Sequence, residues 1–202
     1  MVGSLILFTL MAPPADFAEN FESGMSSWQA HDKTSWKVKS TPFGNVLSLI
    51  KQSHYEPPHR SPYNIILLQD HKFGDFELTA LARSTKEEYG HRDLCVFFGW
   101  QSPDRFYYVH FGQKTDDRAN QIFIVNQADR TKISHQTTPG SPWDDKWHKI
   151  RVRRENGVIT TYFDDMTTPA MIANDDTFGV GLVGLGSFDD TGDFDQVSIK
   201  RL

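Results

Sequence analysis

From Phe21 onward, this chain consists of short stretches in which apolar and polar residues alternate. Successive side chains of a β-strand point to opposite faces, so a period of two predicts strands that bury one face. No window carries an apolar stripe of helical period over the length of a helix. We therefore expect an all-β protein in which helices are at most short connectors.

Turn residues separate the predicted strands. Ser102-Pro103-Asp104 is expected to close one hairpin, and Glu155-Asn156-Gly157 a second one through an Asn-Gly turn. About ten to fourteen strands without a second core predict a two-sheet antiparallel sandwich. The clearest predicted strands are residues 63–69, 76–84, 94–100, 106–112, 121–126, 149–154, 158–163, 180–186 and 194–200.

Alternation also predicts which side chains face the core. In residues 76–83 the apolar set is Phe76, Leu78, Ala80 and Ala82, so Glu77, Thr79 and Arg83 should project from an accessible face. In residues 106–111 we expect Tyr107, Val109 and Phe111 inside, and Phe106, Tyr108 and His110 outside. Residues 94–100 are apolar on both faces, as in a central strand, and we assign Leu94, Val96 and Phe98 to the core.

The composition fits one compact domain of 202 residues with a net charge of -5 and 38% hydrophobic residues. This mild acidity gives no electrostatic reason to expect a nucleic-acid partner. No apolar run beyond the first dozen residues approaches the length that spans a bilayer. Cys95 is the single cysteine, so no disulfide forms within the chain and stability must come from packing, hydrogen bonds or a metal.

The amino terminus has the pattern of an export signal. Residues 5–11 are an apolar run, and residues 12–15 then supply small residues where a signal peptidase could cut. We predict a signal peptide at residues 1–15, a single domain at residues 16–202, and a secreted or periplasmic location. The alternative, a first β-strand, conflicts with Pro13-Pro14, which would interrupt a strand or a helix.

Three segments resemble a known superfamily. Residues 147–165, beginning Trp-His-Lys-Ile-Arg-Val, resemble a hairpin of the concanavalin A-like lectin/glucanase superfamily, including laminin-G-like domains. Phe17-Ala-Glu-Asn-Phe-Glu-Ser-Gly24 is similar to the first strand of those domains, and Gly192-Asp-Phe-Asp-Gln-Val-Ser-Ile199 to their closing strand. The chain resembles secreted bacterial domains of the 3-keto-disaccharide hydrolase-like or laminin-G-like kind. The resemblance implies a jelly roll whose concave sheet binds extended sugars, in a superfold that hosts lectins, adhesion modules, hydrolases and lyases.

Polar and aromatic residues of the predicted strands could line such a groove. Aromatic faces stack on sugar rings, and planar donors bind hydroxyls or carboxylates. Alternatively, these residues are ordinary exposed strand residues and, at 91–93, a strand entry with an internal ion pair. The predicted groove residues are Arg83, His91, Arg92, Tyr108 and His110, with Trp100 at the rim and Glu77 on the same face as Arg83.

The same residues could catalyse glycan cleavage. His110 and Tyr108 could act as base and acid, Arg83 or Arg92 could hold a uronic carboxylate, and His91 lies in the same set. The lyase motifs and the two-glutamate hydrolase motif of the superfamily are absent. Three functions therefore stay open: a saccharide-binding protein, a glycan-cleaving enzyme, and a non-catalytic adhesion module with a protein partner.

The resemblance also implies one structural calcium ion between the first and last strands. The matching positions are Glu22, the carbonyl of Gly24, and Asp195. Carboxylate and carbonyl oxygens are the ligands that Ca²⁺ prefers. The alternative is that Glu22 and Asp195 are solvated turn or edge residues.

Overall fold

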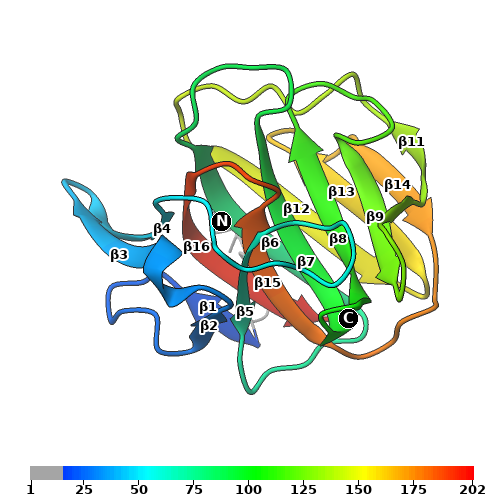
Figure 1. Cartoon of the computed structure of the whole chain (residues 1–202), viewed down its shortest axis with the longest axis horizontal. Helices are drawn as coiled ribbons and strands as arrows, with labels where there is room; N and C mark the ends of the chain where they lie inside the picture. The colour runs from blue at the N-terminus through cyan, green and yellow to red at the C-terminus, as the bar shows by residue number, and fades with distance from the viewer. Residues whose placement is uncertain (1–15) are drawn as a thin grey trace, which may run out of the picture.

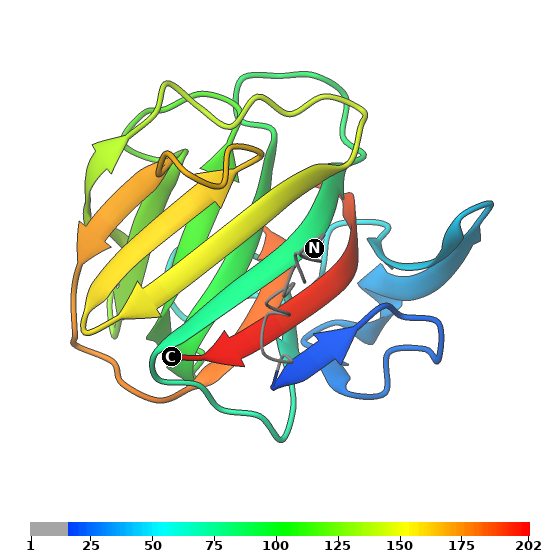
Figure 2. The same cartoon turned by 180° about the vertical axis from the view of Figure 1, so that it is seen from behind.

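A computed structural model describes residues 16–202 of the chain. The predicted signal peptide, residues 1–15, lies outside the described residues. Two antiparallel sheets pack face to face, as the two opposite views show (Figure 1, Figure 2). The helical content of the described part is one short 3-10 turn, Lys33–Ser35. The expected all-β, two-sheet antiparallel architecture is confirmed.

Nine strands form one sheet, in the order β11-β14-β13-β12-β6-β16-β4-β3 with β1 paired to β16. Its strands are β1 (Phe17–Glu19), β3 (Trp36–Thr41), β4 (Gly44–Leu49), β6 (Phe76–Ser84), β11 (Ser134–Thr137), β12 (His148–Glu155), β13 (Val158–Phe163), β14 (Met171–Asn174) and β16 (Gly192–Arg201). The seven-stranded sheet has the order β10-β9-β8-β7-β15-β5-β2. Its strands are β2 (Trp28–Ala30), β5 (Asn64–Leu68), β7 (Asp93–Ser102), β8 (Arg105–Gly112), β9 (Gln121–Asn126), β10 (Thr131–Lys132) and β15 (Leu182–Ser187).

All nine predicted segments are strands, within about two residues at each end. The Asn-Gly turn is confirmed as well, because Asn156 and Gly157 both have positive φ, at 50° and 77°. The sequence pattern missed short strands at sheet edges, such as β10, both of whose residues are exposed. A strand exposed on both faces has no reason to alternate.

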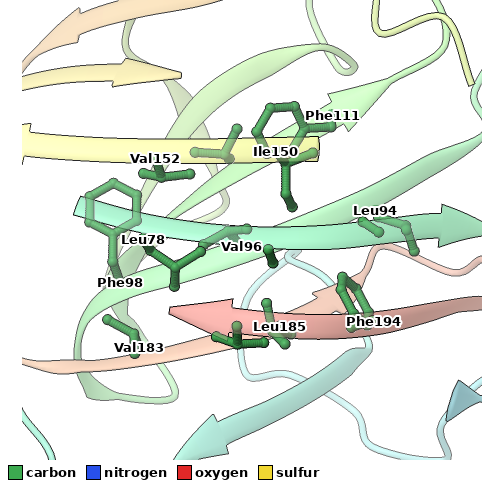
Figure 3. Packing of buried hydrophobic residues seen from close by; sticks show 14 of the residues in the cluster. Leu78, Leu94, Val96, Phe98, Phe111, Ile150, Val152, Val183, Leu185 and Phe194 are labelled. Carbon is green, nitrogen blue, oxygen red and sulfur yellow. The ribbon is translucent and has the colours of Figure 1, made fainter. Parts of the chain in front are cut away.

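The main core lies between the sheets and follows the predicted alternation. Leu78 of β6 and Ile150 and Val152 of β12 pack against Val96 and Phe98 of β7 (Figure 3). The inward residues expected from β8 are also buried in this core. Parity along the strands therefore assigned the buried face correctly.

A second apolar cluster covers the outer face of the seven-stranded sheet. Its members are Ile65, Leu67, Cys95, Phe97, Trp100, Phe106, Tyr108, Phe123 and Val125. Residues 50–63 cross this face (Figure 1), and Tyr55 packs on the cluster from that segment. Tyr108 and His110 do share the face opposite the core, but they are 0% and 3% exposed, so the expected open sheet face is wrong. Among the described residues, no helix is long and apolar enough to cross a membrane.

Candidate functional site

One end of the outer face of the seven-stranded sheet stays open as a pocket of about 270 Å³. Loops far apart in sequence build its walls, and β7 and β8 supply its floor. We call it the His110 pocket. It is lined by Arg60, Tyr89, His91, Asp93, His110, Arg118, Arg130, Phe188 and Asp189.

His110 and Asp93 face each other in the floor. Nε2 of His110 lies 3.7 Å from Oδ2 of Asp93. Nδ1 of His110 accepts the backbone N–H of Asn120 at 3.4 Å, which assigns the proton of the neutral ring to Nε2. Burial lowers the pKa of His110 to about 3, and the positive charge of Arg130 acts in the same direction. The ring is therefore a neutral hydrogen-bond donor near pH 7.

Asp93 is a fully buried carboxyl group with one oxygen left free. Oδ2 accepts the backbone N–H of Phe188 at 2.8 Å and the thiol of Cys95 at 3.3 Å. Oδ1 has no hydrogen-bond partner among residues 16–202, although it is buried. Burial, together with the nearby Asp190, raises the pKa of Asp93 well above its usual range. A buried polar atom without a hydrogen-bond partner costs about 1–3 kcal/mol of stability.

Hydrogen bonds of Asp190 connect two loops to the start of β7. Its Oδ2 accepts the backbone N–H of Asp93 at 2.9 Å, and its Oδ1 accepts the hydroxyl of Tyr89 at 2.7 Å. Burial raises the pKa of Asp190 as well. Asp93, Asp190 and the exposed Asp189 bring carboxylate oxygens within 4.8 Å of one another, a group that could hold a metal ion.

Arg130 and Arg60 form the wall next to Phe188. The guanidinium carbon of Arg130 lies 4.3 Å from the centre of the Phe188 ring, and its Nη1 donates to the hydroxyl of Tyr108 at 2.8 Å. Arg60 lies 5.9 Å from the same ring. The backbone N–H of Arg130 donates to the carbonyl of Arg60 at 3.1 Å, which joins their two loops.

Arg118 and His91 also line the pocket. Oδ1 of Asp116 accepts the backbone N–H of Arg118 at 2.6 Å, an Asx turn that fixes the tip of the loop. Oδ2 of Asp116 lies 3.3 Å from Nε2 of His91. The pocket therefore combines arginine donors, an aromatic face and a buried carboxyl group.

No protein-family model and no curated protein matches this chain by sequence. Solved structures match it over most of its length. The carbohydrate-binding module CBM66 from Bacillus subtilis gives a TM-score of 0.61 at 19% identity, covering 87% of this chain and 96% of the module. A B. subtilis protein of unknown function with a galectin-like fold gives 0.60 at 10% identity, covering 94% and 96%.

Domain 4 of AbnA, from an extracellular arabinanase of Geobacillus stearothermophilus in complex with arabinotriose, gives a TM-score of 0.57 at 8% identity, covering 93% and 92%. The chain is a galectin-like, concanavalin A-like jelly roll. The predicted superfold is thus confirmed. The finer likeness to laminin-G-like and 3-keto-disaccharide hydrolase-like domains stays a prediction.

This jelly roll separates the residues that were expected to share one groove. Arg83 and Glu77 lie on the outer face of the nine-stranded sheet, across the core from His110. Arg83 forms an ion pair with Asp193 there, and Glu77 lies 3.5 Å from Arg153. Neither residue can reach a ligand in the His110 pocket, because the whole sandwich lies between them.

Arg92 and Trp100 are buried and do not line the pocket. Arg92 donates to Oγ and the carbonyl of Ser84 at 2.8 and 2.9 Å and to the carbonyl of Asp144 at 3.1 Å, so it joins three chain segments. Trp100 is 6% exposed and stacks on Phe106 at 4.2 Å in the second cluster. Both roles are structural. Of the predicted set, His91 and His110 line the pocket, and Tyr108 supports it through Arg130.

Sequence reasoning missed Arg60, Arg130, Asp93, Asp190 and Phe188. Asp93 could have been recognised from the sequence, because an acid that opens a continuous apolar strand is expected to be buried and paired. The other four lie in loops, where spacing along the chain holds no information about contacts.

The predicted calcium residues lie at the ends of the chain. Oε1 of Glu22 accepts the backbone N–H of Asn45 at 2.8 Å, and the N–H of Gly24 donates to the carbonyl of Phe21 at 3.1 Å. Burial raises the pKa of Asp195, and the negative charge of Glu22 nearby contributes. Within residues 16–202 the carboxylates grouped closely enough for a metal are those of Asp93, Asp189 and Asp190, so the Glu22 site stays a prediction.

Proposed function

We propose that this protein binds a saccharide in the His110 pocket. The observation that carries the proposal is a cavity of about 270 Å³ whose lining brings together three arginines, His110, the carboxyl group of Asp93 and the ring of Phe188. Sugar hydroxyls pair with such carboxyl groups and with arginine donors, and sugar C–H faces pack on aromatic rings. The similar folds of the carbohydrate-binding module CBM66 and of AbnA domain 4, solved in complex with arabinotriose, support the proposal by analogy.

The cavity volume favours one sugar residue over an extended chain. Drug-sized ligands occupy pockets of about 300–1,000 Å³, so this cavity suits a single ring. Segment 50–63 and the second apolar cluster occupy the sheet face where a long chain would otherwise lie. We therefore propose recognition of a terminal residue rather than of the extended polymer expected from the sequence.

Binding to an array of poly- and oligosaccharides, followed by calorimetry, tests this proposal. Arg60→Ala should weaken binding at least tenfold, because Arg60 lines the pocket from an exposed loop. His54→Ala is the matched control, since His54 is an exposed residue of the same segment outside the pocket. Equal binding by Arg60→Ala and wild type, or no binding of any saccharide, would contradict the proposal.

A glycan-cleaving enzyme is the second candidate, favoured by the 3.7 Å approach of His110 to Asp93. Tyr108 is a poor acid in that scheme, because burial raises its pKa and its hydroxyl accepts from Arg130. Reducing ends and the absorbance of unsaturated products, followed in the same wells, would identify a hydrolase or a lyase. Retention without product supports a binding module. A protein that binds no saccharide would match the adhesion-module alternative with a protein partner.

We also propose one structural Ca²⁺ at Glu22, the carbonyl of Gly24 and Asp195, and a secreted or periplasmic location. The calcium proposal is supported by the proximity of Glu22 and Asp195, whose negative charges interact.

The proposed location rests on the predicted signal peptide. Mass spectrometry of exported protein tests it, and an intact Met1 would contradict cleavage.

A further inference from the structure

The arginines of the His110 pocket differ from most other arginines of this protein in lacking an acidic partner. The chain has ten arginines, and six of them form ion pairs with Asp or Glu. Among the described residues, four have no such pair, and three of these four line the one pocket: Arg60, Arg118 and Arg130. The fourth, Arg105, donates to Gln101 and Asn126 instead.

The acids around the pocket do not neutralise these three charges. Asp117, which follows Asp116 in the loop of Arg118, is paired with Lys132 at 2.6 Å. Asp190 lies 3.8 Å from Lys86, so the acids of the pocket lining itself are the buried Asp93 and the exposed Asp189. The lining therefore carries three arginines against two acids, in a protein whose net charge is -5.

The geometry of the arginines suits a planar anion. The guanidinium carbon of Arg130 lies 4.3 Å from the centre of the Phe188 ring and 4.7 Å from that of Phe123. One of its nitrogens donates to Tyr108, so the other donors remain available to a ligand. Guanidinium groups bind carboxylates with two parallel hydrogen bonds, which gives them an advantage over neutral hydroxyl groups.

We propose that the saccharide of the His110 pocket carries a carboxylate, as a terminal uronic acid does, and that Arg60, Arg118 and Arg130 hold this group. This inference rests on the proposed function and names its substrate class. The sugar hydroxyls then face Asp93 and His110, and the ring packs toward Phe188.

Calorimetry with matched sugars tests the inference: galacturonate against galactose, and glucuronate against glucose, each also as the terminal residue of an oligosaccharide. We expect the acid to bind at least tenfold more tightly than its neutral partner. Arg118→Gln should reduce this preference to about threefold or less. Arg105→Gln, which changes an unpaired arginine outside the pocket, should keep the full preference.

The outcomes separate this inference from the proposed function. Equal affinity for acid and neutral sugars would overturn the inference and leave saccharide binding in place, whereas no binding of any sugar would overturn both. A preference for sulfated sugars over uronates would overturn the carboxylate assignment. Loss of the preference in EDTA would assign it to a cation on Asp93, Asp189 and Asp190 instead of the arginines.

Discussion

His110 shows that the direction of a side chain and its access to solvent are separate properties. Strand parity placed it on the face opposite the main core, together with Tyr108, and the structure agrees. A covering segment then buries that face, so His110 sits at the bottom of a pocket instead of on an open sheet. Burial determines its protonation state.

His110 predicts a pH-dependent stability. Its pKa is about 3 in the folded protein and 6.5 in the unfolded chain, so the unfolded state binds more protons in this range and acid destabilises the fold. The contribution of the neutral His110 to the free energy of unfolding is fully present above about pH 6.5 and is lost as the pH falls toward 3. Between pH 7 and 4.5 we expect wild type to lose about 2 kcal/mol relative to His110→Gln.

Urea unfolding at several pH values measures this difference. The raised pKa of Asp93 acts in the opposite direction, because protonation of a buried carboxyl in acid relieves its cost. Asp93 is present in both proteins, so comparison with His110→Gln largely removes its effect. Parallel pH profiles of the two proteins would show that His110 is not held neutral.

Arg92 is predicted to be a structural residue. Arg92→Ala leaves the buried carbonyl of Ser84 without its donor, and we expect a loss of about 2–4 kcal/mol in the free energy of unfolding. Asp145→Asn is the control, because Asp145 is 98% exposed and its ion pair with Arg92 contributes little. Saccharide affinity should be unchanged in both variants. A stable Arg92→Ala that loses affinity would instead return Arg92 to the binding site.

At the scale of elements, β15 determines how closely the strands of the seven-stranded sheet approach. Gly186 pairs with Ile65 of β5, and a Cβ at position 186 would lie 1.8 Å from the carbonyl oxygen of Asn64. Asn64 in turn donates to Oγ of Ser187 at 2.9 Å and to the carbonyl of Asp190 at 3.2 Å. The end of β15 thus positions the loop that carries Phe188, Asp189 and Asp190 into the pocket.

Gly186→Ala should destabilise the protein by about 3 kcal/mol or more, because backbone atoms must separate to admit the methyl group. Gly179→Ala is the matched control, since nothing lies within 4 Å of a Cβ at that position. Unfolding followed by tryptophan fluorescence measures both. A Gly186→Ala variant as stable as wild type would show that β15 and β5 approach less closely.

At the scale of the whole molecule, the two ends of the described chain lie in one sheet. Phe17 of β1 pairs with Ile199 of β16, and Asp16 forms an ion pair with Arg201 at 2.9 Å. A cation at the proposed Glu22 site would join the segment after β1 to β16. Such a link stabilises the fold through binding to the native state alone.

EDTA should therefore lower the melting temperature, and added Ca²⁺ should restore it. At about one hundred times the Kd of the site, the expected shift is about 5–10 °C. Glu22→Gln should abolish the shift, whereas Asp189→Asn should retain it if the ion binds at the chain ends. Loss of the shift in Asp189→Asn but not in Glu22→Gln would place the ion at Asp93, Asp189 and Asp190. A melting temperature that EDTA leaves unchanged would contradict the calcium proposal.

The amino-acid sequence by itself determined the strands of the sandwich and the face that each one buries. The alternation in β6 and the Asn156-Gly157 turn act over a few residues, because the pleat and the turn are properties of the local backbone. The resemblance of the hairpin and of both ends of the chain then indicated the superfold.

Only the tertiary structure decided which outer face is covered and which polar residues meet. Asp93 and Asp190 are 97 residues apart in the sequence. Arg60 lies close to the Phe188 ring although these two residues are also far apart in the sequence. Arg83 and His110 have similar strand contexts, yet the order of strands places them on opposite sides of the core. These contacts depend on sheet order and on the path of segment 50–63, and the local period of the chain does not encode either.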